Sequence, residues 1–152
     1  AGFKEALRPE FKDYIKSVIA NAKVLSETLK NNGFKIYSGG TDTHLMLVDL
    51  RPFNVKGNAA AESLSKANIT CNKNGIPFDS ESPMITSGIR LGSQAATTRG
   101  FGLKEFQKVG ELITKTVKGI SSNPNDNAKV EDEVRKEVIE LCSKFPIYKN
   151  LR

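Results

Sequence analysis

Apolar residues recur every three or four positions in three long stretches of the chain, which predicts three amphipathic helices. The first covers residues 4–30, where Pro9 either begins the helix or bends one that began earlier. Gly33 comes next and suits the left-handed position at which helices often end. The other two helices cover residues 103–120 and 128–145, separated by a polar segment that contains a proline.

Short apolar runs between these helices predict strands. Residues 34–37 and 45–50 flank a turn that contains two adjacent glycines, so we expect them to form a hairpin. The run LMLVDL at 45–50 is typical of a strand that is buried on both faces or lies at the centre of a sheet. Two further short strands are expected at residues 69–72 and 89–92.

A short alanine-rich helix is expected at residues 59–67, with Asn58 as its N-cap, and residues 93–102 are expected to be irregular. The order of elements predicts one α/β domain, in which a small, largely antiparallel sheet is covered by helices.

The least regular stretch, NKNGIPFDSESPMITSGIRLG at residues 72–92, contains two prolines and several glycines and is expected to be a loop. Arg90 stands near its end between two apolar residues, so its side chain should point away from the core. A guanidinium at the end of a rigid strand suits two-pronged binding of a carboxylate or phosphate. The alternative is an arginine paired with a carboxylate at the edge of the core.

Asn74 and Ser82 can give the loop directional hydrogen bonds to a small molecule, or they can cap its turns. Lys73 is either an anion ligand or a solvated side chain. The only histidine, His44, has no identifiable acid or nucleophile beside it in the sequence, and we interpret it as a structural, hydrogen-bonded residue.

Composition narrows the function further. The 152 residues carry a net charge of +6, but the lysines alternate with Asp and Glu, which favours solvated helix faces over a nucleic-acid surface. No apolar run approaches the roughly 20 residues of a membrane span. Cys71 and Cys142 have no zinc-site spacing and are expected to be structural, as in a reducing cytoplasm. The chain has neither a G-x-G-x-x-G motif nor a P-loop.

Three segments resemble the C-terminal domain of serine hydroxymethyltransferases: YSGGTDTHLMLVDL, ANITCNKNGIPFDSESPMITSGIRLGSQAATTRGF and LCSKFPIY. The resemblance runs from near the start to Tyr148. It implies the small C-terminal domain of a fold-type I, aspartate-aminotransferase-like enzyme that uses pyridoxal phosphate and passes a one-carbon unit between serine and tetrahydrofolate. The implied domain is residues 1–152, with an interdomain helix at 1–33 and an α/β core at 34–152.

The same resemblance implies site residues. Arg90 matches the arginine that binds the α-carboxylate of the amino acid substrate. Asn74 matches a folate contact, and Ser82, Pro83 and Met84 match a segment with further folate contacts. Met84 replaces a phenylalanine that is frequent in the family, and Thr43 replaces a frequent asparagine in the turn before a strand.

The family's Schiff-base lysine lies in a T-T-x-H-K segment, which the sequence does not contain. We therefore expect a fragment without the cofactor-lysine domain: inactive alone, with no specific site for pyridoxal phosphate and no metal site. The parent enzyme is expected to be a cytoplasmic homodimer or tetramer that assembles through the missing large domain, without nucleic-acid or membrane partners. The alternative is a stand-alone basic module that binds RNA or another anion.

Overall fold

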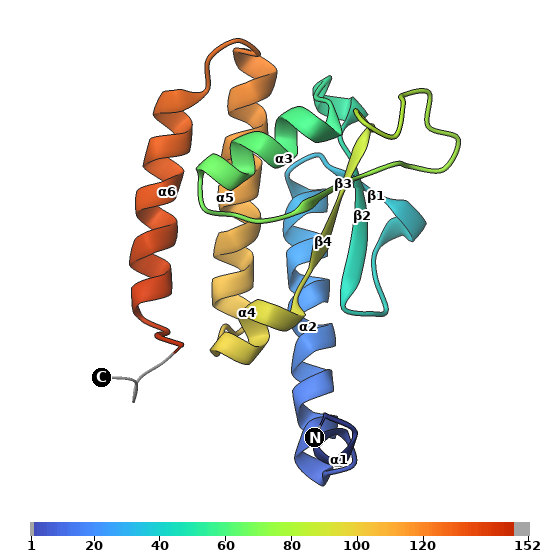
Figure 1. Cartoon of the computed structure of the whole chain (residues 1–152), viewed down its shortest axis with the longest axis vertical. Coiled ribbons are helices and arrows are strands. Elements are labelled where there is room, and N and C mark those ends of the chain that lie inside the picture. Colours follow the sequence, from blue (N-terminus) through green and yellow to red (C-terminus); the bar gives the residue numbers. More distant parts are fainter. Residues whose placement is uncertain (1, 148–152) are drawn as a thin grey trace.

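The computed structural model describes residues 2–147, which form a four-stranded antiparallel sheet with helices packed on one of its faces (Figure 1). The strand order is β1-β2-β4-β3. The strands are β1 (Lys35–Ile36), β2 (Leu45–Asp49), β3 (Asn72–Asn74) and β4 (Gly88–Gly92). The helices are α1 (Gly2–Ala6), α2 (Pro9–Asn31), α3 (Gly57–Lys66), α4 (Gln94–Arg99), α5 (Leu103–Ser122) and α6 (Ala128–Ser143), with 3-10 turns at Tyr37–Gly39 and Arg51–Phe53. The predicted α/β domain with a largely antiparallel sheet is confirmed.

The first predicted helix is divided into α1 and α2 at Pro9. Proline lies in the first turn of α2, where its missing N–H costs no hydrogen bond, so it begins this helix and does not bend a longer one. At the other end Gly33 has φ +95°, and the Phe34 amide donates to the Leu29 carbonyl at 3.1 Å. The predicted glycine end of the helix is confirmed.

The sheet is built around β2 and β4. β1 and β2 form the predicted hairpin, and β2 pairs with β4 over five residues from Leu45↔Gly92 to Asp49↔Gly88. β2 therefore lies inside the sheet, as predicted, but only one of its faces is fully buried, because Leu45 and Leu47 remain partly exposed on the other.

The covered face of the sheet holds the main core. Its buried side chains belong to Ile36, Met46, Val48, Ile89 and Leu91. They pack against apolar residues of α2, α3 and α5, including Leu25, Leu29, Leu64, Phe106, Ile113 and Val117. Burying one such side chain stabilises the fold by roughly 1.5–3 kcal/mol. α6 packs on the outer side of α5 and α3, with Val134 and Val138 buried (Figure 1).

Three sequence-based predictions are wrong in detail. The third strand lies at residues 72–74 and not at 69–72, because its pairing is set by β4 and not by its own apolar residues. Residues 94–99 form the short helix α4 where irregular chain was expected. Contacts with α2 hold this segment in place, since Ser93 Oγ donates to the Val18 carbonyl at 2.7 Å and Asn21 Nδ2 donates to Thr97 Oγ1 at 2.9 Å.

The third error concerns the start of α3. The helix begins at Gly57, and Asn58 is not its N-cap. The Gly57 and Asn58 amides donate instead to the carbonyls of Thr86 and Ile85, each at 2.9 Å. The loop between β3 and β4 therefore satisfies the free amides of the helix in place of a capping side chain. This contact brings the two backbones so close that a side chain at Gly57 would meet Thr86 Oγ1 and the Gly88 carbonyl.

We predict that Gly57→Ala destabilises the chain by about 1–3 kcal/mol, because the added methyl group forces the loop away from α3. Thermal unfolding followed by circular dichroism measures the change. Gly75→Ala is the matched control, since its Cβ would lie 3.8 Å from Asp79 Oδ2, an ordinary contact distance. Equal melting temperatures for wild type and Gly57→Ala would contradict the close packing described here.

Candidate functional site

Arg90 lies on β4 and points to the open face of the sheet, as predicted from the alternation of its neighbours. The strand register places Leu47 on one side of it and Asn72 on the other. Its Nη2 donates to Asn72 Oδ1 at 3.5 Å, a long hydrogen bond. Among the residues that the structure describes, no carboxylate lies within ion-pair distance of Arg90. The guanidinium is thus exposed and available to an external anion.

The arginine that does pair with a carboxylate at the core edge is Arg51. Its Nη2 donates to Asp49 Oδ2 at 2.7 Å and its Nε to Asp49 Oδ1 at 3.0 Å, while the Asp49 side chain is almost fully buried. Burial raises the pKa of Asp49, but the hydrogen bonds and charge of Arg51, together with Lys35, outweigh it and hold the pKa below its usual value. Sequence reasoning missed this pair, although its spacing of two residues was visible.

Asn74 is the last residue of β3 and pairs with Gly88 of β4. Gly88 precedes Arg90 by two residues on the same strand. Asn74 Nδ2 donates to the carbonyl of the adjacent Gly75 at 2.8 Å, an exposed hydrogen bond that leaves both alternatives for this side chain open. Lys73 pairs with Ile89 in the register, so its side chain points to the face opposite Arg90.

The loop of residues 75–87 carries the segment Ser82–Met84. All three residues are exposed, and Met84 has 73% of its surface accessible. The Ile85 and Thr86 amides both donate to the Ser82 carbonyl at 3.0 Å, so the segment forms a tight turn. Phe78 is fully exposed in the same loop. The loop therefore presents apolar side chains to solvent from a hydrogen-bonded backbone.

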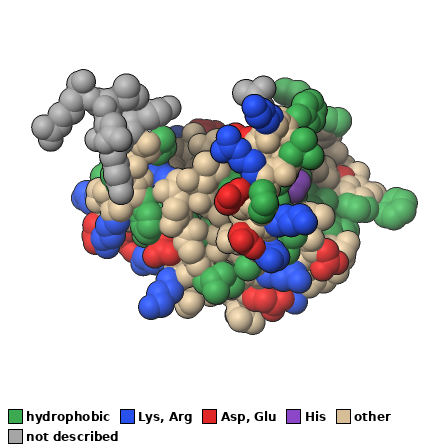
Figure 2. All heavy atoms as spheres, turned by 90° about the horizontal axis from the view of Figure 1, so that it is seen from below, with side chains coloured by type: hydrophobic (Ala, Val, Ile, Leu, Met, Phe, Trp, Pro, Cys, Tyr) green, Lys and Arg blue, Asp and Glu red, His purple; other side chains and the backbone are tan. Residues whose placement is uncertain are grey.

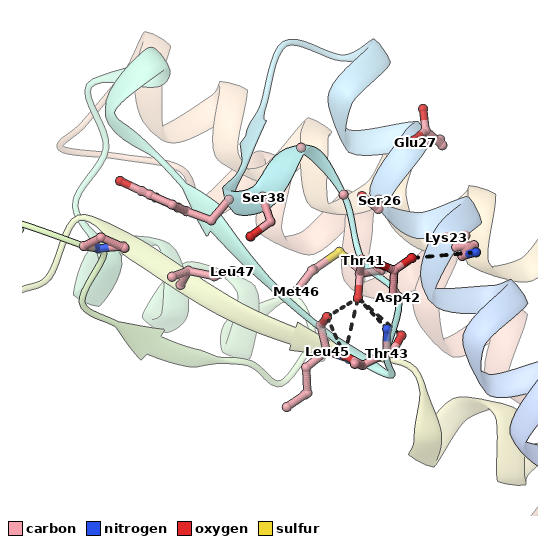
Figure 3. A pocket seen from close by; sticks show the side chains of 14 residues that line it. Lys23, Ser26, Glu27, Ser38, Thr41, Asp42, Thr43, Leu45, Met46 and Leu47 are labelled. Atoms are coloured by element: carbon pink, nitrogen blue, oxygen red, sulfur yellow. Dashed lines mark hydrogen bonds and ion pairs between the residues drawn. The ribbon is translucent and has the colours of Figure 1, made fainter.

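A separate hollow of about 780 Å³ lies between α2, the turn of residues 37–43 and the start of β2 (Figure 3). Thr41 organises its rim, because Thr41 Oγ1 donates to the Leu45 carbonyl at 2.5 Å and accepts from the Thr43 amide at 3.1 Å. From the predicted site loop only Pro77 reaches this hollow. Sequence reasoning gave no sign of it, since half of its lining residues come from a turn whose shape depends on backbone geometry.

The histidine and the two cysteines lie outside the loop that carries Ser82–Met84 and differ in their contacts. His44 is partly buried; its backbone carbonyl accepts from the Ser93 amide at 3.0 Å, but its imidazole makes no hydrogen bond to the described residues, so the predicted hydrogen-bonded role is not found. Burial raises the pKa of Cys71 to about 11, which leaves its thiol protonated at neutral pH. Cys71 and Cys142 both pack against the core, as predicted.

Charges on the surface are mixed. The face in Figure 2 shows Lys and Arg side chains interleaved with Asp and Glu. Many lysines make ion pairs, for example Lys115 with Glu133 at 3.0 Å and Lys108 with Glu137 at 2.6 Å. Within residues 2–147 there is no cluster of His, Cys, Asp and Glu that could hold a metal ion. In the same range no helix is long and apolar enough to cross a membrane.

Comparison with known proteins places these features in a family. Residues 1–113 match the family model described as serine hydroxymethyltransferase. The chain is 87% identical over 152 residues to a serine hydroxymethyltransferase of Pelagibacter ubique, an alignment that covers 100% of this chain and 35% of that relative. It is 62% identical over 147 residues to a serine hydroxymethyltransferase of Marinomonas sp., covering 97% of this chain and 35% of the relative. The chain thus spans about a third of the length of the curated relatives it matches.

We predict that Asp49→Asn lowers the free energy of unfolding by about 1–3 kcal/mol at pH 7, because the charged hydrogen bonds to Arg51 are lost. The pKa of Asp49 is lowered in the folded chain, so its contribution is present above the usual value of 3.8 and is lost as the pH falls through the lowered value. Urea unfolding at several pH values measures both variants. The difference between wild type and Asp49→Asn should shrink toward low pH, and a constant difference would contradict the assignment.

Proposed function

The chain belongs to the serine hydroxymethyltransferase family, and we propose that it supplies the substrate-carboxylate and folate contacts of an enzyme that interconverts serine and glycine. In this reaction serine and tetrahydrofolate give glycine and methylenetetrahydrofolate. We assign residues 1–152 to one C-terminal domain of the aspartate-aminotransferase-like fold, with an interdomain helix at 1–33 and a core at 34–152. The antiparallel sheet covered by helices supports this assignment, as does α2, whose first half extends beyond the rest of the fold (Figure 1).

The observation that carries the proposal is the exposed guanidinium of Arg90. A planar guanidinium matches the two oxygens of a carboxylate, and the rigid strand fixes the direction of the bond. Arg51 also carries a guanidinium, but its Nε and Nη2 already donate to the Asp49 carboxylate. We therefore assign the α-carboxylate of serine or glycine to Arg90. Holding the carboxylate at this point orients the bonds of the substrate Cα for reaction.

The folate contacts are assigned to Asn74, Ser82, Pro83 and Met84. The amide and hydroxyl groups can form directional hydrogen bonds with a pterin ring, and the thioether of Met84 can cover its flat face. The strong exposure of Met84 supports this assignment, since the side chain contributes little to the core.

Pyridoxal phosphate is the cofactor that the family implies, and the lysines of this chain do not fit its covalent anchor. When bound, this cofactor supplies an electron sink to the amino acid. Its lysine needs a lowered pKa, which burial provides. Every lysine in residues 2–147 except Lys108 is exposed, and the hydrogen bond that Lys115 donates to Glu133 raises the Lys115 pKa. We therefore propose that the chain binds no cofactor specifically by itself and that the rest of the parent enzyme, a cytoplasmic homodimer or tetramer, holds it.

The test uses a chimera in which this chain replaces the matching segment of the Pelagibacter ubique relative. We predict that Arg90→Ala raises KM for serine and lowers kcat, with a loss of about 2–4 kcal/mol of transition-state stabilisation. Steady-state kinetics with tetrahydrofolate measure both constants. Arg135→Ala is the control, since Arg135 is an exposed arginine paired with Asp132 on the outer helix α6. Unchanged kinetics in Arg90→Ala would refute the role given to this residue.

A second prediction concerns the chain by itself. We expect no cleavage of serine, even with excess pyridoxal phosphate, because residues 2–147 offer no buried lysine for the cofactor. Borohydride reduction after titration with the cofactor, followed by peptide mapping, should label no lysine stoichiometrically. The intact Pelagibacter relative serves as the positive control. Stoichiometric labelling of one lysine in this chain would overturn the proposal that the rest of the parent enzyme holds the cofactor.

A further inference from the structure

The carboxylate of Asp79 lies at the base of the loop that carries Ser82–Met84 and joins its two limbs. Asp79 Oδ2 accepts from the Ile76 amide at 3.1 Å on the outgoing limb and from the Ser87 amide at 2.9 Å on the returning limb. Oδ1 accepts from Ser87 Oγ at 2.6 Å and from the Glu81 amide at 3.0 Å. Four hydrogen bonds thus converge on a single side chain.

These bonds are strong because the acceptor is ionised. Burial raises the pKa of Asp79, but the hydrogen bonds from Ser87, Glu81 and Ile76 outweigh it and hold the pKa far below its usual range. The carboxylate therefore stays charged at any pH at which the protein would be assayed. Its donors are three backbone amides and one hydroxyl, and none of the described lysines or arginines forms an ion pair with it.

The loop needs this support because its own backbone is unfavourable in two places. Phe78 and Thr86 both have positive φ, +57° and +62°, which bulky or β-branched residues rarely adopt. Thr86 is held by its Oγ1 bond to the Gly88 carbonyl at 3.1 Å and by the contact of its carbonyl with α3. Phe78 is fully exposed, so the neighbouring Asp79 is the side chain that fixes the chain at this point.

We propose that Asp79 is a positioning residue that sets the shape of residues 76–87 and thereby the affinity of the enzyme for tetrahydrofolate, without touching either substrate. The inference rests on the proposed function, which assigns the folate contacts to this loop. Glu81, whose amide Asp79 holds, directly precedes Ser82 in the chain. A loop that adopts its binding shape only part of the time binds its ligand more weakly by that fraction.

Serine binding should respond differently. Arg90 is held by strand pairing on both sides, with Leu47 of β2 and Asn72 of β3, and these pairs do not involve Asp79. Loss of the Asp79 carboxylate should therefore raise KM for tetrahydrofolate much more than KM for serine. This separation distinguishes a positioning role in the loop from a general loss of stability, which would affect both substrates together.

The experiment uses the full-length chimera described above and compares Asp79→Asn, Ser87→Ala and Asp126→Asn. In Asp79→Asn an amide nitrogen replaces one oxygen and faces backbone donors, whereas Ser87→Ala removes only one of the four bonds. Asp126 is the matched control, because it is also a loop aspartate that accepts from a backbone amide, that of Ala128 at 3.0 Å, but lies between α5 and α6.

We expect KM for tetrahydrofolate to rise about tenfold in Asp79→Asn, less in Ser87→Ala and not at all in Asp126→Asn, while KM for serine changes by less than about twofold. Amide hydrogen exchange of residues 76–87 should follow the same order: fastest in Asp79→Asn, less accelerated in Ser87→Ala and unchanged in Asp126→Asn. Equal increases in both KM values, or unchanged exchange in the loop, would overturn the inference. A wild-type chimera without serine turnover would refute the proposed function itself, and the folate role of Asp79 with it.

Discussion

The pairing of β4 between β2 and β3 is the constraint on which both the core and the site depend. Ile89 and Leu91 point into the helices, and Arg90 between them points to the open face. A slip of one residue in the register would bury the guanidinium and expose both apolar side chains. Each of these side chains contributes roughly 1.5–3 kcal/mol by burial, so the same energy that stabilises the core also fixes the direction of Arg90.

The loop after β3 follows a different logic, because it has almost no core to hold it. Its backbone groups must find partners within the loop or on neighbouring elements. Asp79 supplies acceptors for amides on both limbs, and the amides at the start of α3 supply donors for the carbonyls of Ile85 and Thr86. The loop is therefore ordered by polar contacts. This leaves the apolar groups of Phe78 and Met84 exposed for other contacts.

The sequence predicted the parts of the molecule in which side-chain periodicity reflects burial. The long helices, the hairpin and the outward direction of Arg90 belong to this group. The predictions were wrong for the start of α3, the position of β3 and the helix α4, because each of these features depends on hydrogen bonds with distant segments. Asp79 was missed for the same reason, since its partners are mostly backbone amides, which leave no trace in a pattern of side chains.

The two kinds of support match the two kinds of ligand proposed for the site. A carboxylate is small and planar, and it is recognised best by a fork whose position does not vary, which a strand inside a sheet provides. A pterin with its attached groups is larger and needs contacts spread over several residues, which a turn can place around it. A loop in this role must still be ordered before binding, or part of the binding energy is lost in ordering it. The polar framework of the loop provides that order without a core of its own, and its cost is the strained backbone at Phe78 and Thr86.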